Sequence, residues 1–275
     1  MKTASPDTMQ SQKAIIDFKV LENRKLTASY SLLRLTPVSD AVQFDFGTVM
    51  PGQFVEVQVA DSPTTFLRRP ISVHYVDVAA SELQLLVRVA GDGTRHLCDM
   101  EAGGVLNIML SLGHGFSVDC KCERPLLVGG GVGVAPLLYL GKQLVDAGVK
   151  PTFLLAAKTK ADLLLVERFA QFGDVLLSTD DGSAGHPGLV TVNPALSDGD
   201  FDMIYCCGPM PMMKGVAAIA HKRGIPCEVS LENVMACGLG ACLCCVEDTV
   251  DAGNVCVCKE GPVFDVNRLR WFEKA

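Results

Sequence analysis

Six cysteines crowded near the carboxyl end constrain this chain more than any other feature. They fall within 22 positions, in a segment from Leu231 to about Phe264 that is rich in glycine and cysteine. This segment is too poor in large side chains to pack a core of its own, and a bound metal centre would supply the missing stability. The six are Cys237, Cys242, Cys244, Cys245, Cys256 and Cys258.

The spacing of four of these thiols predicts the kind of metal centre. Cys237-x4-Cys242-x2-Cys245, with Cys258 13 residues later, is the pattern of plant-type 2Fe-2S proteins. In such a centre four thiolates hold two irons. A structural zinc site is the alternative, but such sites usually contain two CxxC motifs, and only one CxxC motif with its own partner loop is present here.

Small residues between the first two thiols support the iron-sulfur interpretation. Gly238, Gly240 and Ala241 keep the loop narrow enough to wrap closely around sulfide, with its backbone N–H groups free to point inward. On spacing alone Cys256 could replace Cys258 as the fourth ligand, so this choice stays open at this point.

Composition excludes several other classes of protein. The 275 residues suffice for two domains with a small appendage, and 49% of them are hydrophobic, which predicts packed cores and not a disordered chain. The formal net charge of -7 and the absence of any Lys/Arg block argue against nucleic acid as a partner. Met1 to Lys13 is polar, without the apolar core of a signal peptide, so we expect a reducing cytoplasm and no disulfide scaffold. Pro125 to Gly141 is the longest uncharged stretch, but its five glycines and two prolines argue against a transmembrane span.

The pattern of apolar runs and turn residues changes near residue 120. Before it, short apolar runs separated by turn residues predict an antiparallel β-barrel or sandwich with one short helix near Thr94 to Met100. After it, apolar runs alternate with helical segments, including one over Ala161 to Phe172, which predicts a parallel sheet with crossover helices. We therefore expect three parts: a barrel over 1–120, an α/β nucleotide-binding domain over 121–230 and a cluster segment over 231–275. The expected barrel strands are Ala14 to Val20, Ser29 to Leu35, Gln53 to Val59, Leu83 to Val89 and Val105 to Leu110.

Two places in the predicted barrel could bind a pyrophosphate. The run Arg68 to Ser72 ends a β-region segment, and there Arg69 offers a planar fork for phosphate while Ser72 adds a hydroxyl. The run Leu86 to Thr94 passes from a strand through a glycine turn into a short helix, whose first amides form an anion site.

The second domain has two loops suited to a nucleotide. The first, Val128 to Pro136, joins a strand to a helix through Gly129, Gly130, Gly131 and Gly133, so that a diphosphate could approach bare backbone. It is not a GxGxxG fingerprint, because Pro136 occupies the third glycine position, and a tight turn without any ligand is the alternative. The second loop is Cys207-Gly208-Pro209. None of the five histidines has metal-ligand spacing, so we assign no catalytic histidine.

Taken in order, these motifs resemble the electron-transfer subunits of NAD-dependent dihydroorotate dehydrogenase, within the ferredoxin-NADP reductase superfamily. The similarity covers about residues 14 to 270 and is most specific at Met235 to Val246 and Val257 to Phe264. The resemblance implies Cys258, and not Cys256, as the fourth ligand. It implies that the flavin is FAD, bound at Arg69, Pro70, Ile71, Ser72, Leu86, Val87, Arg88, Gly93 and Thr94.

The resemblance also implies a division of labour with a second chain. NAD accepts a hydride, an iron-sulfur cluster passes single electrons, and a flavin can do both, so FAD has to lie between the other two. No length remains here for an FMN-bearing barrel of roughly 250 residues. The resemblance therefore implies an FMN-containing catalytic subunit as partner, in a heterotetramer of two copies of each chain, serving pyrimidine biosynthesis.

Two other functions remain as alternatives. One is a related diaphorase subunit of an NADPH-dependent ferredoxin oxidoreductase or a sulfhydrogenase. The other is a non-catalytic, zinc-stabilised nucleotide-binding regulator. The choice of NAD over NADP depends on the resemblance, because Lys158 stands where an acidic residue would have indicated a ribose hydroxyl.

Overall fold

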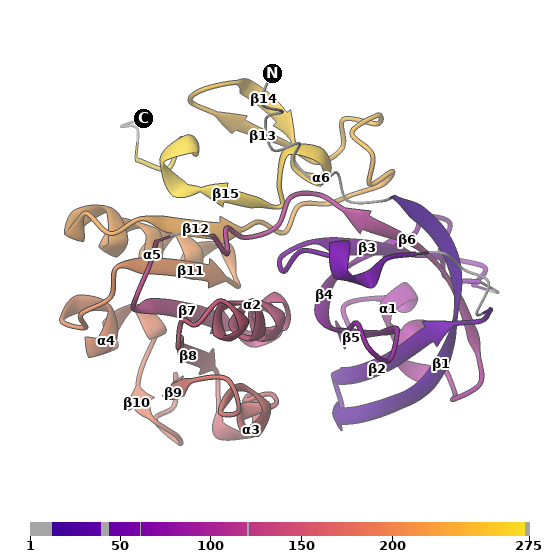
Figure 1. Ribbon diagram of the computed structural model, residues 1–275, viewed down its shortest axis with the longest axis horizontal. Coiled ribbons are helices and arrows are strands. Elements are labelled where there is room, and N and C mark those ends of the chain that lie inside the picture. The colour runs from indigo at the N-terminus through magenta and orange to yellow at the C-terminus, as the bar shows by residue number, and fades with distance from the viewer. Residues whose placement is uncertain (1–12, 40–43, 61, 120, 273–275) are drawn as a thin grey trace, which may run out of the picture.

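The computed structural model describes residues 13–39, 44–60, 62–119 and 121–272. A β-barrel and a parallel sheet lie side by side, and the C-terminal segment lies along one end of both (Figure 1). Most of the polar stretch at the start of the chain falls outside the described residues. None of the helices in the described part is long and apolar enough to cross a bilayer.

The barrel is closed by six antiparallel strands in the order β1-β2-β5-β4-β3-β6, which confirms the predicted all-β first part. Alternate residues point inward and form one core that includes Phe18, Leu33 and Leu85. The elements are β1 (Ala14–Thr27), β2 (Tyr30–Pro37), η1 (Phe46–Thr48), β3 (Phe54–Val57), β4 (Arg69–Asp77), β5 (Glu82–Arg88), α1 (Asp92–Asp99) and β6 (Val105–Leu112).

The second part is a seven-stranded sheet in the order β10-β9-β8-β7-β11-β12-β15, parallel except for β15. The predicted α/β class is therefore confirmed. Its elements are β7 (Pro125–Gly130), η2 (Gly131–Val134), α2 (Ala135–Asp146), β8 (Thr152–Ala157), η3 (Lys160–Asp162), α3 (Val166–Phe169), β9 (Asp174–Thr179), β10 (His186–Pro187), η4 (Val190–Val192), α4 (Pro194–Ser197), β11 (Met203–Cys207), α5 (Met210–Arg223) and β12 (Cys227–Ser230).

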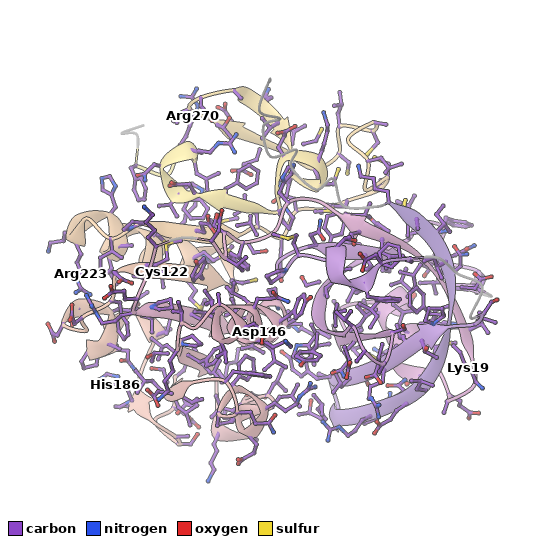
Figure 2. The ribbon with its side chains drawn as sticks, in the orientation of Figure 1. Lys19, Cys122, Asp146, His186, Arg223 and Arg270 are labelled. Carbon is purple, nitrogen blue, oxygen red and sulfur yellow. The ribbon has the colours of Figure 1, made fainter. Side chains whose placement is uncertain are left out.

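Hydrogen bonds from one side chain to backbone oxygen atoms hold an outer loop of this sheet. Arg223, at the end of α5, donates to the carbonyl oxygens of Leu196 at 2.7 Å and Gly199 at 2.6 Å, so the loop after α4 is fastened to α5 (Figure 2).

The C-terminal segment joins the sheet instead of forming a separate core. It contains β13 (Val246–Thr249), β14 (Gly253–Cys256), α6 (Val257–Glu260), β15 (Val263–Asp265) and η5 (Val266–Arg268). Phe264 and Leu269 belong to the same buried cluster as the sheet residues Val128 and Val229. Sequence reasoning correctly found that this segment lacks its own core.

The barrel and the sheet are fixed to each other through α2 and α3. Nδ1 of the buried His74, on β4, donates to the carbonyl oxygen of Ala135 at 2.8 Å; burial lowers the pKa of this imidazole to about 3 and keeps it neutral. Arg168 lies over the ring of Tyr75 at 5.4 Å and donates to Gln84 at 2.7 Å. These contacts place the first turn of α2 against β4.

Two expectations about elements were wrong. The helix expected over Ala161 to Phe172 is replaced by η3 and the four-residue α3, and between them Leu165 adopts a left-handed backbone, at φ 54°, that a helix cannot contain. Three successive leucines cannot all face the core from a helix. The run at Arg68 to Ser72 does not end a strand but opens β4, which continues to Asp77.

Candidate functional site

A cavity of about 360 Å³ opens where the barrel, the sheet and the C-terminal segment meet. This volume is in the range of small-molecule pockets, roughly 300 to 1,000 Å³. Its lining is mostly apolar with a few polar groups. The lining residues are Phe54, Pro70, Ile71, Ser72, Leu86, Arg88, Ala90, Thr94, Val132, Ala135, Ser230, Leu231, Glu232, Asn233, Val234, Met235 and Pro262.

Most of the residues expected to hold a flavin line this cavity. Pro70, Ile71 and Ser72 come from the start of β4, and Leu86 and Arg88 come from the end of β5. The neighbouring strands β4 and β5 thus bring together two sequence segments that sequence reasoning treated separately. Three expected residues do not line it: the side chain of Val87 is buried in the barrel core, and Arg69 and Gly93 lie outside the lining.

The structure brings the two expected anion-binding features together. The side chain of Arg69 lies against Gly93 at the start of α1: a Cβ built on Gly93 would be 2.6 Å from the Arg69 Nε. The hydroxyl of Thr94 accepts N–H bonds from Ala90 at 2.8 Å and Gly91 at 3.1 Å, which closes the turn before the helix. A guanidinium and the first amides of α1 therefore face the same place, as pyrophosphate binding requires.

Arg68 has a different role from its neighbour. Its guanidinium donates to the carbonyl oxygens of Glu56 at 3.1 Å and Asn107 at 2.9 Å, and to Asn107 Oδ1 at 2.5 Å. All three acceptors lie on β3 and β6. Arg68 therefore fastens the end of the loop before β4 to the barrel.

The two nucleotide loops pack on each other. A Cβ on Gly133 would lie 2.4 Å from the carbonyl oxygen of Cys207 and 2.6 Å from the Cα of Gly208. A Cβ on Gly130 would lie 2.4 Å from the sulfur of Met212. Gly131, at φ 58°, is the more open glycine, with only the Tyr30 hydroxyl nearby at 3.6 Å. Much of the glycine content therefore serves the close approach of the two loops.

The remaining expected residues of these loops shape the helix starts. Gly129 packs against Val134 at the end of η2, Pro136 is buried in the first turn of α2, and Pro209 is exposed at the N-cap of α5. Cys207 is buried, and burial raises the pKa of its thiol well above the ordinary value, so it is a small apolar residue and not a nucleophile.

The sequence analysis did not identify one group of residues that lines the cavity. Ser230 to Met235 leave the carboxyl end of β12 and run under the cavity. Because ligands of parallel sheets lie beyond the carboxyl ends of the strands, identifying β12 would have found them. Glu232 faces the cavity opposite Arg88; burial raises its pKa, and the positive charge of Arg88 opposes that rise.

The four expected cluster ligands lie in two pairs. The thiol of Cys237 interacts with Cys242, and that of Cys258 interacts with Cys245. Within the described part of the chain, no three His, Cys, Asp or Glu side chains gather around one point as ligands of a single metal ion would.

Backbone N–H groups point at three of these sulfur atoms, as the small residues of the loop predict. Leu239 N donates to Cys237 Sγ at 3.4 Å, Gly240 N to Cys258 Sγ at 3.1 Å, and Cys258 N to Cys245 Sγ at 3.4 Å. The Leu239 N–H, with further N–H groups of the loop, lowers the pKa of the Cys237 thiol to about 6. Such donors suit the negative charge of an iron-sulfur centre, so the chemistry of this loop fits that group.

Of the two surplus thiols, Cys256 also lies near the expected ligands, because burial and then the charges of Cys245, Cys242 and Cys237 raise the pKa of its thiol. Cys244 is exposed, and Cys256 directs its sulfur at the carbonyl oxygen of Gly240, at 3.6 Å. The N–H of the same glycine points at Cys258 instead. A thiolate is stabilised by the donor and not by the acceptor, so the geometry favours Cys258 over Cys256.

Known structures define the class of this protein. The structure of an NADH-dependent reduced ferredoxin-NADP oxidoreductase, solved to study flavin-based electron bifurcation, matches with a TM-score of 0.81 and 28% identity, over 93% of this chain and 90% of that one. The FAD/NAD-binding domain of nitric oxide dioxygenase from Vibrio cholerae O1 biovar El Tor matches with a TM-score of 0.63 and 21% identity, over 78% of this chain and 98% of that domain, which supports the fold alone. The barrel, the sheet and the cavity between them are those of an oxidoreductase with the ferredoxin-NADP reductase fold.

Sequence relatives define the family. Residues 232–270 match the model of the iron-sulfur cluster binding domain of dihydroorotate dehydrogenase B. The electron transfer subunit of dihydroorotate dehydrogenase B (NAD(+)) from Shouchella clausii is 40% identical over 225 residues, covering 80% of this chain and 86% of the relative. The corresponding subunit from Caldanaerobacter subterraneus is 41% identical over 218 residues, covering 78% and 84%.

The chain belongs to the family of dihydroorotate dehydrogenase B electron transfer subunits. The expected oxidoreductase role, with FAD, a 2Fe-2S cluster and NAD, is confirmed by this family and by the fold. The diaphorase and zinc-regulator alternatives are less well supported, because the full-length relatives share about 40% identity and the cysteine segment matches an iron-sulfur family.

Proposed function

We propose that this chain takes electrons from an FMN-containing catalytic subunit that oxidises dihydroorotate, and delivers them to NAD through a 2Fe-2S cluster and FAD. When bound, the cluster supplies one-electron transfer, FAD links one-electron to two-electron chemistry, and NAD accepts the hydride. The residues of this chain bind and orient these groups and exclude water from between them.

Four cysteines are proposed to hold the cluster: Cys237, Cys242, Cys245 and Cys258. Support comes from their arrangement in two pairs and from the N–H groups that point at their sulfur atoms. Gly238 and Gly240, at φ 66° and 79°, adopt the left-handed backbone that turns these N–H groups inward.

FAD is proposed to occupy the cavity between the barrel and the sheet. The Arg69 guanidinium, with the amides of Gly93 and Thr94 at the start of α1, would hold the pyrophosphate. The strand segments Pro70–Ser72 and Leu86–Arg88 would position the flavin ring.

NAD is proposed to bind at the carboxyl edge of the sheet, over the flavin. Gly129 to Gly133 and Pro136, at the start of α2, and Cys207 to Pro209, at the start of α5, would form its two loops. Support comes from Val132 and Ala135, which extend from the first loop into the wall of the cavity.

One observation carries this proposal: the wall of the cavity continues directly into the cluster loop. Met235 lines the cavity and the first proposed iron ligand, Cys237, follows two residues later. Two residues span at most about 7 Å of extended chain. A flavin in the cavity and a cluster in the loop would therefore lie close enough for direct electron transfer.

The partner and the setting are part of the proposal. We propose a heterotetramer of two catalytic and two electron-transfer subunits, acting in the cytoplasm in pyrimidine biosynthesis, with the name of the family as support for a partner chain. Within this chain we propose residues 1–120 as the FAD part, 121–230 as the NAD part and 231–275 as the cluster part.

The division of labour can be tested with the purified chain. We expect flavin and iron-sulfur absorbance, iron and sulfide in equal amounts, and dye reduction by NADH, but no oxidation of dihydroorotate. Co-expression with an FMN barrel protein from the same source should restore dihydroorotate-dependent NAD reduction in a complex of four chains. Dihydroorotate turnover by the isolated chain would overturn the proposal.

A further inference from the structure

Strand β3 carries a carboxyl group in an unusual place, on the outer wall of the barrel yet out of contact with water. Val55 and Val57 belong to the barrel core, so alternation directs Phe54 and Glu56 to the other face of the strand. The C-terminal segment covers this face, and Glu56 has 0% exposure. A fully buried carboxyl group is rare, because burial removes its hydration.

The side chain of Glu56 lies directly against the cluster loop. A Cβ built on Gly238 would be 2.9 Å from the Glu56 Cγ and 3.4 Å from its Oε1, with Leu112 of β6 at 3.0 Å on the other side. Gly238 follows the proposed ligand Cys237 but is not itself a ligand. On the same strand, Phe54 lines the cavity proposed for FAD. Glu56 therefore lies beside the path between the two proposed redox groups.

No hydrogen bond within the described residues satisfies this carboxyl group: both Oε atoms lack a partner. The nearest guanidinium, that of Arg68, donates to the backbone oxygen of Glu56 and to Asn107 instead. Burial, the largest effect, raises the pKa of Glu56, and the positive charges of Arg68 and Arg69 oppose this rise. On the β6 side its pairing partner is the uncharged Met109.

We propose that Glu56 is a positioning residue for electron transfer, whose carboxyl group sets the reduction potential of the iron-sulfur cluster held by the loop above it. The inference depends on the proposed cluster at that loop. An ionised Glu56 would place an unpaired negative charge against the loop that holds the cluster, in a poorly screened place, and so would disfavour addition of an electron. A neutral Glu56 removes that penalty.

Protonation of Glu56 would balance the charge of an electron that arrives at the cluster loop. When one electron arrives from the partner subunit, the ionised Glu56 takes one proton from water, and it returns that proton to water when the electron moves on to the flavin. The net charge around the loop is then the same before and after each transfer. At pH values where Glu56 stays neutral throughout, only the electron moves.

The test is a redox titration of the FAD- and cluster-loaded chain from about pH 6 to 9, followed by electron paramagnetic resonance of the reduced cluster. We expect the wild-type potential to fall as the pH rises through this range, with up to a tenfold change in equilibrium constant per pH unit, or 59 mV for one electron. In Glu56→Gln, which keeps the shape but has no ionisable group, the potential should be independent of pH and higher than wild type at the alkaline end. Glu228→Gln, at a half-buried acid on β12 whose carboxyl group accepts hydrogen bonds from Ser117, is the matched control and should follow wild type.

Several results would overturn the inference. They are superimposable pH profiles for Glu56→Gln and wild type, a pH-independent wild-type potential, or a constant offset at every pH, which would indicate packing instead of charge. If Glu56→Gln does not fold, Glu56→Met gives the same comparison, and the wild-type profile decides without any variant. A chain that shows no 2Fe-2S signal at all would contradict the proposed function itself, and this inference would fail with it.

Discussion

Two glycines of the flavin loop, Gly91 and Gly93, should differ in their effect on FAD binding when each is replaced by alanine. At Gly91 the backbone is extended, with φ -175°, and an added Cβ would meet nothing within 4 Å. At Gly93 an added Cβ would lie 2.6 Å from the Arg69 Nε and 3.0 Å from the Thr65 Cγ2. Because carbon and nitrogen atoms need well over 3 Å, Gly93→Ala forces the Arg69 guanidinium to move by about 1 Å.

The cost of that movement can be worked out from the bond it breaks. A charge-assisted hydrogen bond from Arg69 to a phosphate contributes about 1.5 to 3 kcal/mol. Since about 1.4 kcal/mol is tenfold in affinity, Gly93→Ala should weaken FAD binding by roughly ten- to a hundredfold. Gly91→Ala should leave FAD affinity unchanged, because nothing lies within 4 Å of the added methyl group.

The assay is FAD binding to the flavin-stripped chain, followed by quenching of flavin fluorescence. Iron and sulfide content serves as an internal control, because the cysteine loop is distant in sequence from both substitutions. Equal FAD affinities for the two variants, whether both weak or both normal, would refute the reasoning that the side chain of Arg69 lies over Gly93 in order to hold the pyrophosphate.

Three further predictions follow from the cysteine loop and the barrel. Cys242→Ser should remove most of the iron and sulfide while FAD and NADH-dependent dye reduction remain; unchanged iron content measured by colorimetric analysis would contradict the cluster assignment. Cys258→Ser should lose the reduced-cluster resonance while Cys256→Ser keeps it, and the reverse result would exchange their roles. Two hydrogen bonds from the Arg34 guanidinium, at 2.6 and 2.8 Å, are the chief cause that lowers the pKa of Glu82. The ionised carboxylate of Glu82 therefore stabilises the fold fully above the ordinary carboxyl pKa, and this stabilisation disappears as the pH falls through the lowered pKa. Glu82→Gln should therefore destabilise the fold by about 1 to 3 kcal/mol at pH 7 but by less near pH 3, in chemical denaturation; an equal loss at both pH values would show that the charge is not responsible.

The class of each part of the fold could be predicted from the sequence because period and turn residues are local signals. Strands with alternating burial, such as the first half of Ala14–Thr27, and the strand-to-helix passage at Gly131–Ala135 show their type within a few residues. The strands β12 and β15 could not be found this way. Cys227–Ser230 is only four residues long and Val263–Asp265 only three. The first is a strand because it pairs with β11, about 20 residues earlier, and the second because it pairs with β12 across an interval of more than 30 residues.

The chemistry of the site was predictable to a similar degree. Residue types and spacing identified the four thiols, Arg69 and the glycine loops, since these groups have few other uses in such patterns. The burial of Glu56 was not predictable, because a glutamate within a strand is ordinarily an exposed residue. It depends on the close approach of Gly238, more than 180 positions away in the sequence.

The antiparallel pairing of β12 with β15 has a consequence for how this chain could be altered. Glu228, Val229 and Ser230 pair with Asp265, Phe264 and Val263, so everything between the two strands is topologically the connection of one long hairpin. The metal-binding portion is therefore an insertion into the rim of a reductase and not a module appended to its end. Replacing that insertion with a short turn would leave β15 to seal the edge of the sheet, whereas truncating the chain before β15 would expose that edge to aggregation.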